Sequence, residues 1–148
     1  MTLAVVPEDR DDALMAWRAV NPESLPSEWP VFASLLRRAL VAGDGSYSER
    51  DVLASLLIGQ SRLWSYSAPI ESPISICITE IVTYPQKRKC LVRYIAGEWP
   101  PFRDHFDKLL IYAQSQGCKT IEAYMRKGFE RKLPPEWTVR HVFAVRDC

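Results

Sequence analysis

The feature that most constrains this chain is a pair of alternating segments joined by a short polar turn. In residues 74–83, isoleucine occupies positions 74, 76 and 78, and the positions between them are small. Residues 89–96 alternate in a similar way, and residues 84–88 between them are mostly polar. A period of two is typical of a strand whose two faces differ, so the pattern predicts an antiparallel β-hairpin.

The period changes after the hairpin. Apolar residues then recur three or four positions apart, which predicts an amphipathic helix with one buried stripe: Phe102, Phe106, Leu109, Leu110 and Ala113. Gly117 is suited to end this helix, and residues 120–125 predict a short strand. A crossover helix between two strands favours parallel pairing. The predicted fold class is α/β (α+β), with a central mixed sheet and helices on both faces.

The first 60 residues read as helical. The expected helices cover residues 7–20, 30–41 and 48–59, the last with Ser48 as its N-cap. We expect them to pack beside the sheet and complete one core. Further strands are expected over 62–67 and 138–145, with a short helical turn over 126–133 between the last two strands. The expected organisation is one domain, residues 1–148, with a helical part (1–60) and a sheet core (61–148).

Composition sets broad limits on function. The 148 residues are 47% hydrophobic and 25% charged, as in soluble globular domains, and no apolar run reaches the roughly 20 residues of a membrane span. Four cysteines without a C-x-x-C pair, and only two histidines, predict reduced thiols and no metal site. Residues 1–84 carry a net charge of −5 and residues 85–148 a net charge of +6. That asymmetry could order copies head to tail, whereas a net charge of only +1 does not favour a nucleic-acid partner.

From residue 61, the predicted order of elements resembles the core of the GNAT (N-acetyltransferase) superfamily. The segments that carry the resemblance are Leu63-Trp64, residues 78–90, Gly97, residues 113–118 and residues 126–133. Within the superfamily, the chain resembles small acetyltransferase-like proteins encoded by tailed bacteriophages. The resemblance covers roughly residues 48 to 145, and it implies a location in the host cytoplasm or in the phage virion.

The resemblance also implies a place for a cofactor. In active members, backbone amides in a glycine-rich run after the central strand hold the diphosphate of coenzyme A. The corresponding residues of this chain are Tyr94, Ile95, Gly97 and Trp99, within a turn that reads Gly97-Glu98-Trp99-Pro100-Pro101-Phe102. One glycine, two prolines without N–H groups and a carboxylate make a poor anion cradle. The motif is therefore interpreted as degenerate, and no cofactor is expected; if the chain is an active enzyme, the cofactor is acetyl-CoA.

Two residues could perform acid–base chemistry in an active enzyme. Glu80, in an otherwise apolar and small strand, could act as a base, and Tyr124, at the end of a strand, could act as an acid. The structural alternatives are a Glu80 paired with Arg93 across the hairpin and a Tyr124 at the edge of the core. His105 is expected on a helix surface, and His141 in a half-buried structural position.

Three tryptophans next to prolines, Trp29, Trp99 and Trp137, are candidate contact residues; the alternative is that they cover the edge of the core. Together these features predict a non-catalytic bacteriophage protein that acts by contacts with proteins, such as virion components, host proteins or copies of itself. The alternative is an acetyl-CoA-dependent N-acetyltransferase with an atypical cofactor loop. Nucleic-acid binding through residues 87–89 and 126–132 is a weaker third interpretation.

Overall fold

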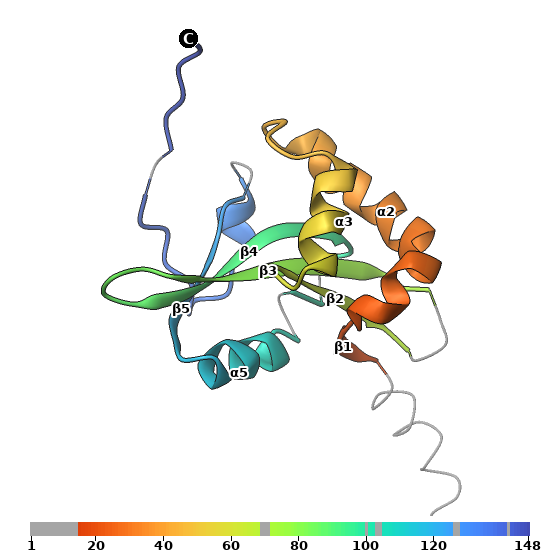
Figure 1. Cartoon of the computed structure of the whole chain (residues 1–148). Coiled ribbons are helices and arrows are strands. Elements are labelled where there is room, and N and C mark those ends of the chain that lie inside the picture. The colour runs from red at the N-terminus through yellow and green to blue at the C-terminus, as the bar shows by residue number, and fades with distance from the viewer. Residues whose placement is uncertain (1–14, 69–71, 100, 103–104, 126–127, 142) are drawn as a thin grey trace, which may run out of the picture.

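A five-stranded mixed sheet forms the centre of the molecule (Figure 1). The computed structural model describes residues 15–68, 72–99, 101–102, 105–125, 128–141 and 143–148. The strands lie in sequence order across the sheet, β1-β2-β3-β4-β5; the first three junctions are antiparallel and β4 pairs with β5 in parallel. Their bounds are β1 Ala16–Ala19, β2 Arg62–Ser67, β3 Ser75–Thr83, β4 Arg88–Gly97 and β5 Cys118–Ala123.

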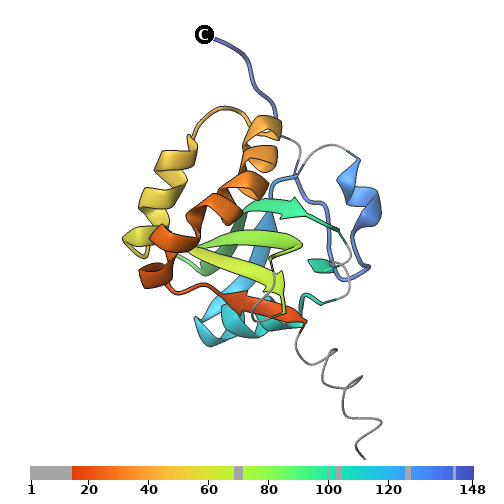
Figure 2. The same ribbon diagram turned by 90° about the vertical axis from the view of Figure 1, so that its right-hand side faces the viewer.

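Helices cover both faces of the sheet, as the sequence predicted. Helices α2 (Leu25–Ala42) and α3 (Glu49–Leu57) lie on one face, and α5 (Asp107–Ser115) lies on the other (Figures 1 and 2). Two short 3-10 helices, η2 (Pro22–Ser24) and η3 (Phe129–Lys132), complete the regular elements. The mixed sheet between helical layers confirms the expected α+β fold class.

The alternation in the hairpin divides the core into two parts. Ile76 and Ile78 of β3 pack with residues of α2 and α3, whereas Cys77 between them packs in the cluster on the α5 side. These side chains are almost fully buried, so the two-residue period read from the sequence separates the two faces correctly. The hairpin and the parallel β4-α5-β5 unit are both confirmed. Helix α5 begins only at Asp107, so Phe102 and His105 precede it, and Leu110 of the expected buried stripe is 43% exposed.

The helix expected over residues 7–20 is wrong for the part of it that the structure describes. Residues 1–14 lie outside the described residues, and Ala16–Ala19 form β1, which pairs antiparallel with β2. The helical spacing that predicted residues 7–20 came from Ala13, Leu14, Trp17 and Val20, and Trp17 lies in β1. Trp17 is 1% exposed on β1, because the strand closes one edge of the sheet and brings its ring against residues far away in the sequence.

Helix α2 begins five residues earlier than Pro30, where the sequence placed its start. A proline inside a helix removes a hydrogen bond and costs about 3 kcal/mol. The sequence analysis therefore placed Pro30 at the start of the helix and residues 23–28 in a turn before it. In the structure Pro30 lies inside α2, and Leu25 in the first turn is 1% exposed in the core. Burial of that first turn offsets the interruption.

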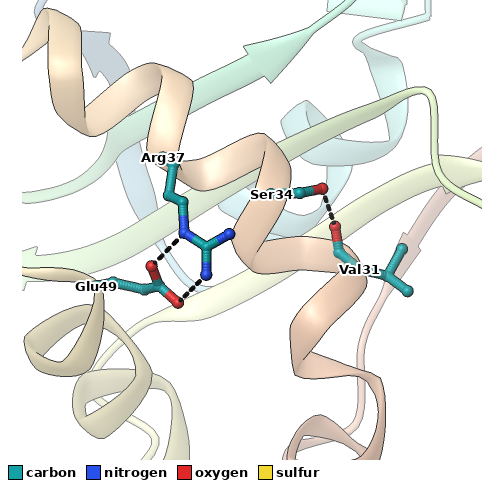
Figure 3. A network of polar contacts seen from close by, with 4 residues as sticks. All are labelled: Val31, Ser34, Arg37 and Glu49. Carbon is teal, nitrogen blue, oxygen red and sulfur yellow. Dashed lines mark hydrogen bonds and ion pairs between the residues drawn. The ribbon is translucent and has the colours of Figure 1, made fainter.

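Helix α3 begins where Ser48 predicted. The Ser48 hydroxyl accepts a hydrogen bond from the Asp51 N–H, and the Asp51 carboxylate accepts one from the Ser48 N–H, so aspartate completes a capping box. These hydrogen bonds hold the pKa of Asp51 below its ordinary value. At the same end of α3, Arg37 of α2 makes a two-point ion pair with Glu49, with its Nε 2.8 Å from Oε2 (Figure 3). The pair links the two helices of this layer.

The expected strand over 138–145 is also wrong. The described residues from 138 onward have no regular structure, and the segment leads away from the sheet (Figure 1). Just before it, the ring of Trp137 packs on Phe106, with ring centroids 5.4 Å apart. An alternating segment becomes a strand only if its backbone finds a partner, and Val139, Phe143 and Val145 remain more than 60% exposed.

All four cysteines are free, and Cys77 and Cys90 are buried. Burial raises the pKa of the Cys90 thiol to about 11, which keeps it protonated and inert. Within the described part of the chain, no group of side chains suits a metal ion, and no helix is long and apolar enough to cross a membrane.

Candidate functional site

Strands β4 and β5 separate at one end of the sheet. Their pairing runs from Arg88 opposite Cys118 to Val92 opposite Ala123, whereas β4 itself continues to Gly97. The two strands therefore enclose a wedge beside Ile95 and the turn after it. A crevice beyond the carboxyl ends of neighbouring parallel strands is a common place for a ligand.

A bulge in β4 adjoins the wedge. Ile78 of β3 lies opposite Tyr94 and Thr79 lies opposite Val92, which leaves Arg93 without an opposite residue on β3. Bulges of this kind redirect side chains and often occur near functional sites. Here Arg93 Nε lies 2.9 Å from the Glu80 carboxylate, so the bulge residue forms an ion pair on the neighbouring strand.

Gly97 has a structural reason to be glycine. Its φ is +104°, and a Cβ at this position would lie 2.2 Å from the Ile74 carbonyl oxygen and 2.6 Å from Ser75 Cα. The end of β4 therefore passes the start of β3 at a distance that only glycine permits. Close packing within the hairpin therefore explains why this residue is glycine, and a role in binding phosphate is not needed to explain it.

The turn after Gly97 presents few free amides. The Glu98 N–H donates to the Ile74 carbonyl at 3.1 Å, and the Phe102 N–H donates to the Trp99 carbonyl at 2.9 Å. Pro101 has no N–H, and neither does Pro100, which lies outside the described residues. Ser75 Oγ donates to the Glu98 carbonyl at 2.7 Å and fixes the turn further. A diphosphate needs several converging N–H donors, and this turn has already used two of them.

Aromatic side chains fill the wedge. Trp99 is half-buried, stacks on Phe102 with centroids 6.0 Å apart, and meets Phe129 edge-on at 5.4 Å. With Leu133 and Trp137 it leaves a cavity of about 20 Å³, room for about one water molecule and far less than a diphosphate needs. The Trp99 indole N–H is buried without an acceptor among the described residues. The described part of the turn therefore offers few donors to a diphosphate.

The four residues expected at the cofactor position divide between the two faces. Ile95 and Trp99 belong to the cluster on the α5 side, next to the wedge. Tyr94 packs on the opposite side, against the core under α2 and α3, and burial raises the pKa of its phenol. Gly97 joins β4 to the turn.

The structure gives Glu80 and Tyr124 different surroundings. Glu80 is in the ion pair with Arg93 that the sequence suggested as its structural alternative. Tyr124 follows β5, is 75% exposed, and meets Phe143 with ring centroids 6.5 Å apart. No hydrogen bond joins Glu80 to Tyr124 in the described part of the chain.

The histidines and the remaining tryptophans have no catalytic arrangement. His105 is exposed and its ring lies 5.6 Å from that of Tyr66. His141 is exposed as well, so its expected half-buried position is wrong. Trp29 is half-buried against the core beneath α2, and Trp137 is half-buried on Phe106.

The sequence analysis missed residues that are far from Trp99 in the sequence but help to close the wedge. Leu133 and Pro134 line the cavity although they lie more than 30 positions after Trp99. Trp17 of β1 donates its indole N–H to the Pro101 carbonyl at 3.1 Å, which ties the edge strand to the turn. In the sequence, the only hint of these contacts was that Trp29, Trp99 and Trp137 each lie near a proline.

Comparison with known proteins defines the class of fold. No family model matches the chain, and no curated protein sequence matches it. Among solved structures, an aminoglycoside acetyltransferase from an uncultured soil metagenomic sample, in complex with sisomicin, is 13% identical with a TM-score of 0.62; the match covers 93% of this chain and 98% of that one. The ribosomal-protein-alanine N-acetyltransferase from Brucella melitensis biovar Abortus 2308 is 12% identical, with a TM-score of 0.62 and coverage of 90% and 98%.

A third similar structure is an aminoglycoside N-acetyltransferase in complex with CoA. It is 15% identical with a TM-score of 0.59, and the match covers 90% of this chain and 95% of that one. The chain therefore has the acetyltransferase-like fold. At these identities the likeness concerns the fold, and function must be argued from the site.

Proposed function

We propose that this chain is a non-catalytic protein with an acetyltransferase-like fold, and that it acts by contacts with other proteins. The observation that carries the proposal is the filled wedge between β4 and β5, where Trp99 and Trp137 leave about 20 Å³. The used amides of the turn after Gly97 support the same conclusion. The resemblance to proteins of tailed bacteriophages supports virion proteins, host proteins or copies of itself as partners.

Exposed apolar side chains near the C-terminus support protein contacts. Tyr124 and Phe143 are 75% and 76% exposed and touch each other, and Val139 and Val145 lie nearby in sequence with similar exposure. Apolar groups gathered on a surface are typical of interaction sites. Opposite net charges of the N-terminal and C-terminal parts favour a second copy of the chain among the possible partners.

Titration with acetyl-CoA, followed by isothermal calorimetry on the full chain, tests the absence of a cofactor. We expect no saturable heat, because the wedge lacks both space and amide donors; an active N-acetyltransferase of the same fold serves as positive control. A micromolar Kd would overturn the proposal and favour the alternative, an acetyl-CoA-dependent N-acetyltransferase. In that case Glu80→Gln and Tyr124→Phe should each remove turnover of an amine substrate.

Light scattering after size-exclusion chromatography, over a range of protein concentrations, tests contacts between copies. We expect the mean mass to rise with concentration and Phe143→Ser to weaken that rise, because the substitution removes an exposed aromatic from the apolar surface. Val41→Ser is the matched control, since Val41 is an exposed apolar residue (87%) of another element, α2. A monomer at all concentrations would exclude copies of the chain as partners.

A further inference from the structure

Strand β5 is an open edge of the sheet. It pairs with β4 on one side, and within the described residues no strand pairs with its other side. The strand at the opposite edge, β1, has four residues, whereas β5 has six. An edge strand leaves a row of N–H and C=O groups without partners, and proteins usually shorten, charge or cover such a strand. Strand β5 is therefore a longer template for a further strand than β1 is.

The side chains of β5 leave room for a neighbour. Lys119 is exposed and the other five residues are half-buried, although Ile121 and Ala123 pack against the cluster on the α5 side. The Glu122 carboxylate is neutralised by Lys89, whose Nζ lies 2.9 Å from it. No proline interrupts β5. The α5 face of this edge therefore keeps apolar surface that the side chains of an added strand would cover.

The C-terminal segment, residues 138–145, has the pattern of a strand but lies outside the sheet. Apolar or aromatic side chains occupy every second position: Val139, His141, Phe143 and Val145. The valines and the phenylalanine are more than 60% exposed. No backbone hydrogen bond joins residues 138–141 or 143–148 to another described residue. At about 3.3 Å per residue, the segment is long enough to run along all of β5.

The position of this segment favours a second copy of the chain as the owner of the β5 edge that it joins. Phe143 meets Tyr124, which directly follows β5, and the segment then leads away from its own sheet (Figures 1 and 2). The donor segment and the acceptor edge belong to the same chain, so two copies can exchange segments reciprocally. Such an exchange closes a two-fold dimer. The opposite net charges of residues 1–84 and 85–148 favour the approach of two copies.

We propose that residues 138–145 of one copy pair as an added strand along β5 of a second copy, with their apolar side chains on the α5 face beside Ile121 and Ala123. Backbone hydrogen bonds to an open sheet edge supply affinity, and the alternating side chains supply the register. The inference rests on the proposed function, because it specifies how a second copy is bound.

Backbone amide hydrogen exchange of the full chain, followed by ¹H–¹⁵N NMR at low and high protein concentration, tests the added strand. Light scattering gives the mass of each sample. We expect alternate amides of β5 to exchange about tenfold more slowly, or slower still, in the dimer than in the monomer. The amides of β1, at the opposite edge, are the internal control and should not change.

Three results would overturn the added strand. If a dimer forms without slower exchange in β5, the copies meet at another surface, and the proposed function stands without this inference. If the β5 amides are already protected in the monomer, the edge is occupied by a segment of its own chain. A monomer at all concentrations excludes the exchange, whereas the titration with acetyl-CoA still tests the absence of a cofactor.

Proline substitutions at two adjacent positions separate strand pairing from apolar contact alone. Neighbouring N–H groups of a strand point to opposite sides, so Arg140→Pro and His141→Pro remove one N–H that faces β5 and one that faces solvent. We expect one of the two to raise the dimer Kd about tenfold or more, and the other to stay within about threefold of the wild type. Arg140→Ala and His141→Ala are the matched controls for the side chains. Both positions are exposed and lack regular structure, so the monomer should remain folded. Equal Kd values for the two proline variants would reject strand pairing.

Discussion

Replacing Gly97 by alanine is expected to lower the free energy of unfolding by about 3 kcal/mol or more. Two effects add. The φ of +104° is unfavourable for any residue with a Cβ, and the new methyl group would lie 2.2 Å from the Ile74 carbonyl oxygen. That oxygen and Ser75 Cα are backbone atoms at the start of β3, so relief of the overlap requires the strand to move.

Urea unfolding of the wild type, Gly97→Ala and Gly59→Ala separates the two effects. Gly59 also has positive φ, +80°, but a Cβ there would meet nothing within 4 Å. Its substitution should therefore cost only the conformational strain, about 1–2 kcal/mol. Equal losses for the two variants would show that the close approach of β4 to β3 contributes nothing.

Replacing Trp17 by alanine is expected to cost about 3–5 kcal/mol of stability. The side chain is 1% exposed, and its ring lies 5.3 Å from Tyr66 and 4.9 Å from Phe102. The substitution also removes the donor to the Pro101 carbonyl, which ties β1 to the turn after Gly97. The Pro101 carbonyl still accepts a hydrogen bond from the His105 N–H at 3.1 Å, so the expected loss comes mainly from the cavity.

Trp17→Phe is the matched variant, because it keeps an aromatic ring in the core and removes the indole N–H. It should cost clearly less than Trp17→Ala, about 1–3 kcal/mol from the lost hydrogen bond and the smaller ring. Equilibrium denaturation measures both variants. A loss below about 1 kcal/mol for Trp17→Ala would contradict the burial of this residue in β1.

The sequence predicted those elements whose signal is local. The hairpin of β3 and β4 and helix α5 each bury a periodic set of side chains. Ile76 and Cys77, neighbours in sequence, face opposite parts of the core for that reason. The cap of α3 is equally local, since Ser48 and Asp51 exchange hydrogen bonds within one turn.

The candidate site was predictable only in part. The turn after Gly97 was recognised from its glycine and prolines, and its covalent chemistry alone limits the number of amide donors. The filling of the wedge by Leu133 and Trp137 could not be predicted, because it depends on how residues after β5 return to β4.

By itself, the sequence determined the alternating hairpin, the crossover helix and the poor supply of amides after Gly97, because each depends on side chains and peptide groups within a few positions of one another. Three outcomes could be seen only in the folded molecule: residues 16–19 form an edge strand, residues 138–141 and 143–145 do not form a strand, and Trp99 occupies the wedge. Those outcomes depend on pairing and packing between distant segments, such as Trp17 with Pro101, 84 positions apart. The periodicity of a segment does not specify which distant strand it pairs with or which distant side chain packs against it.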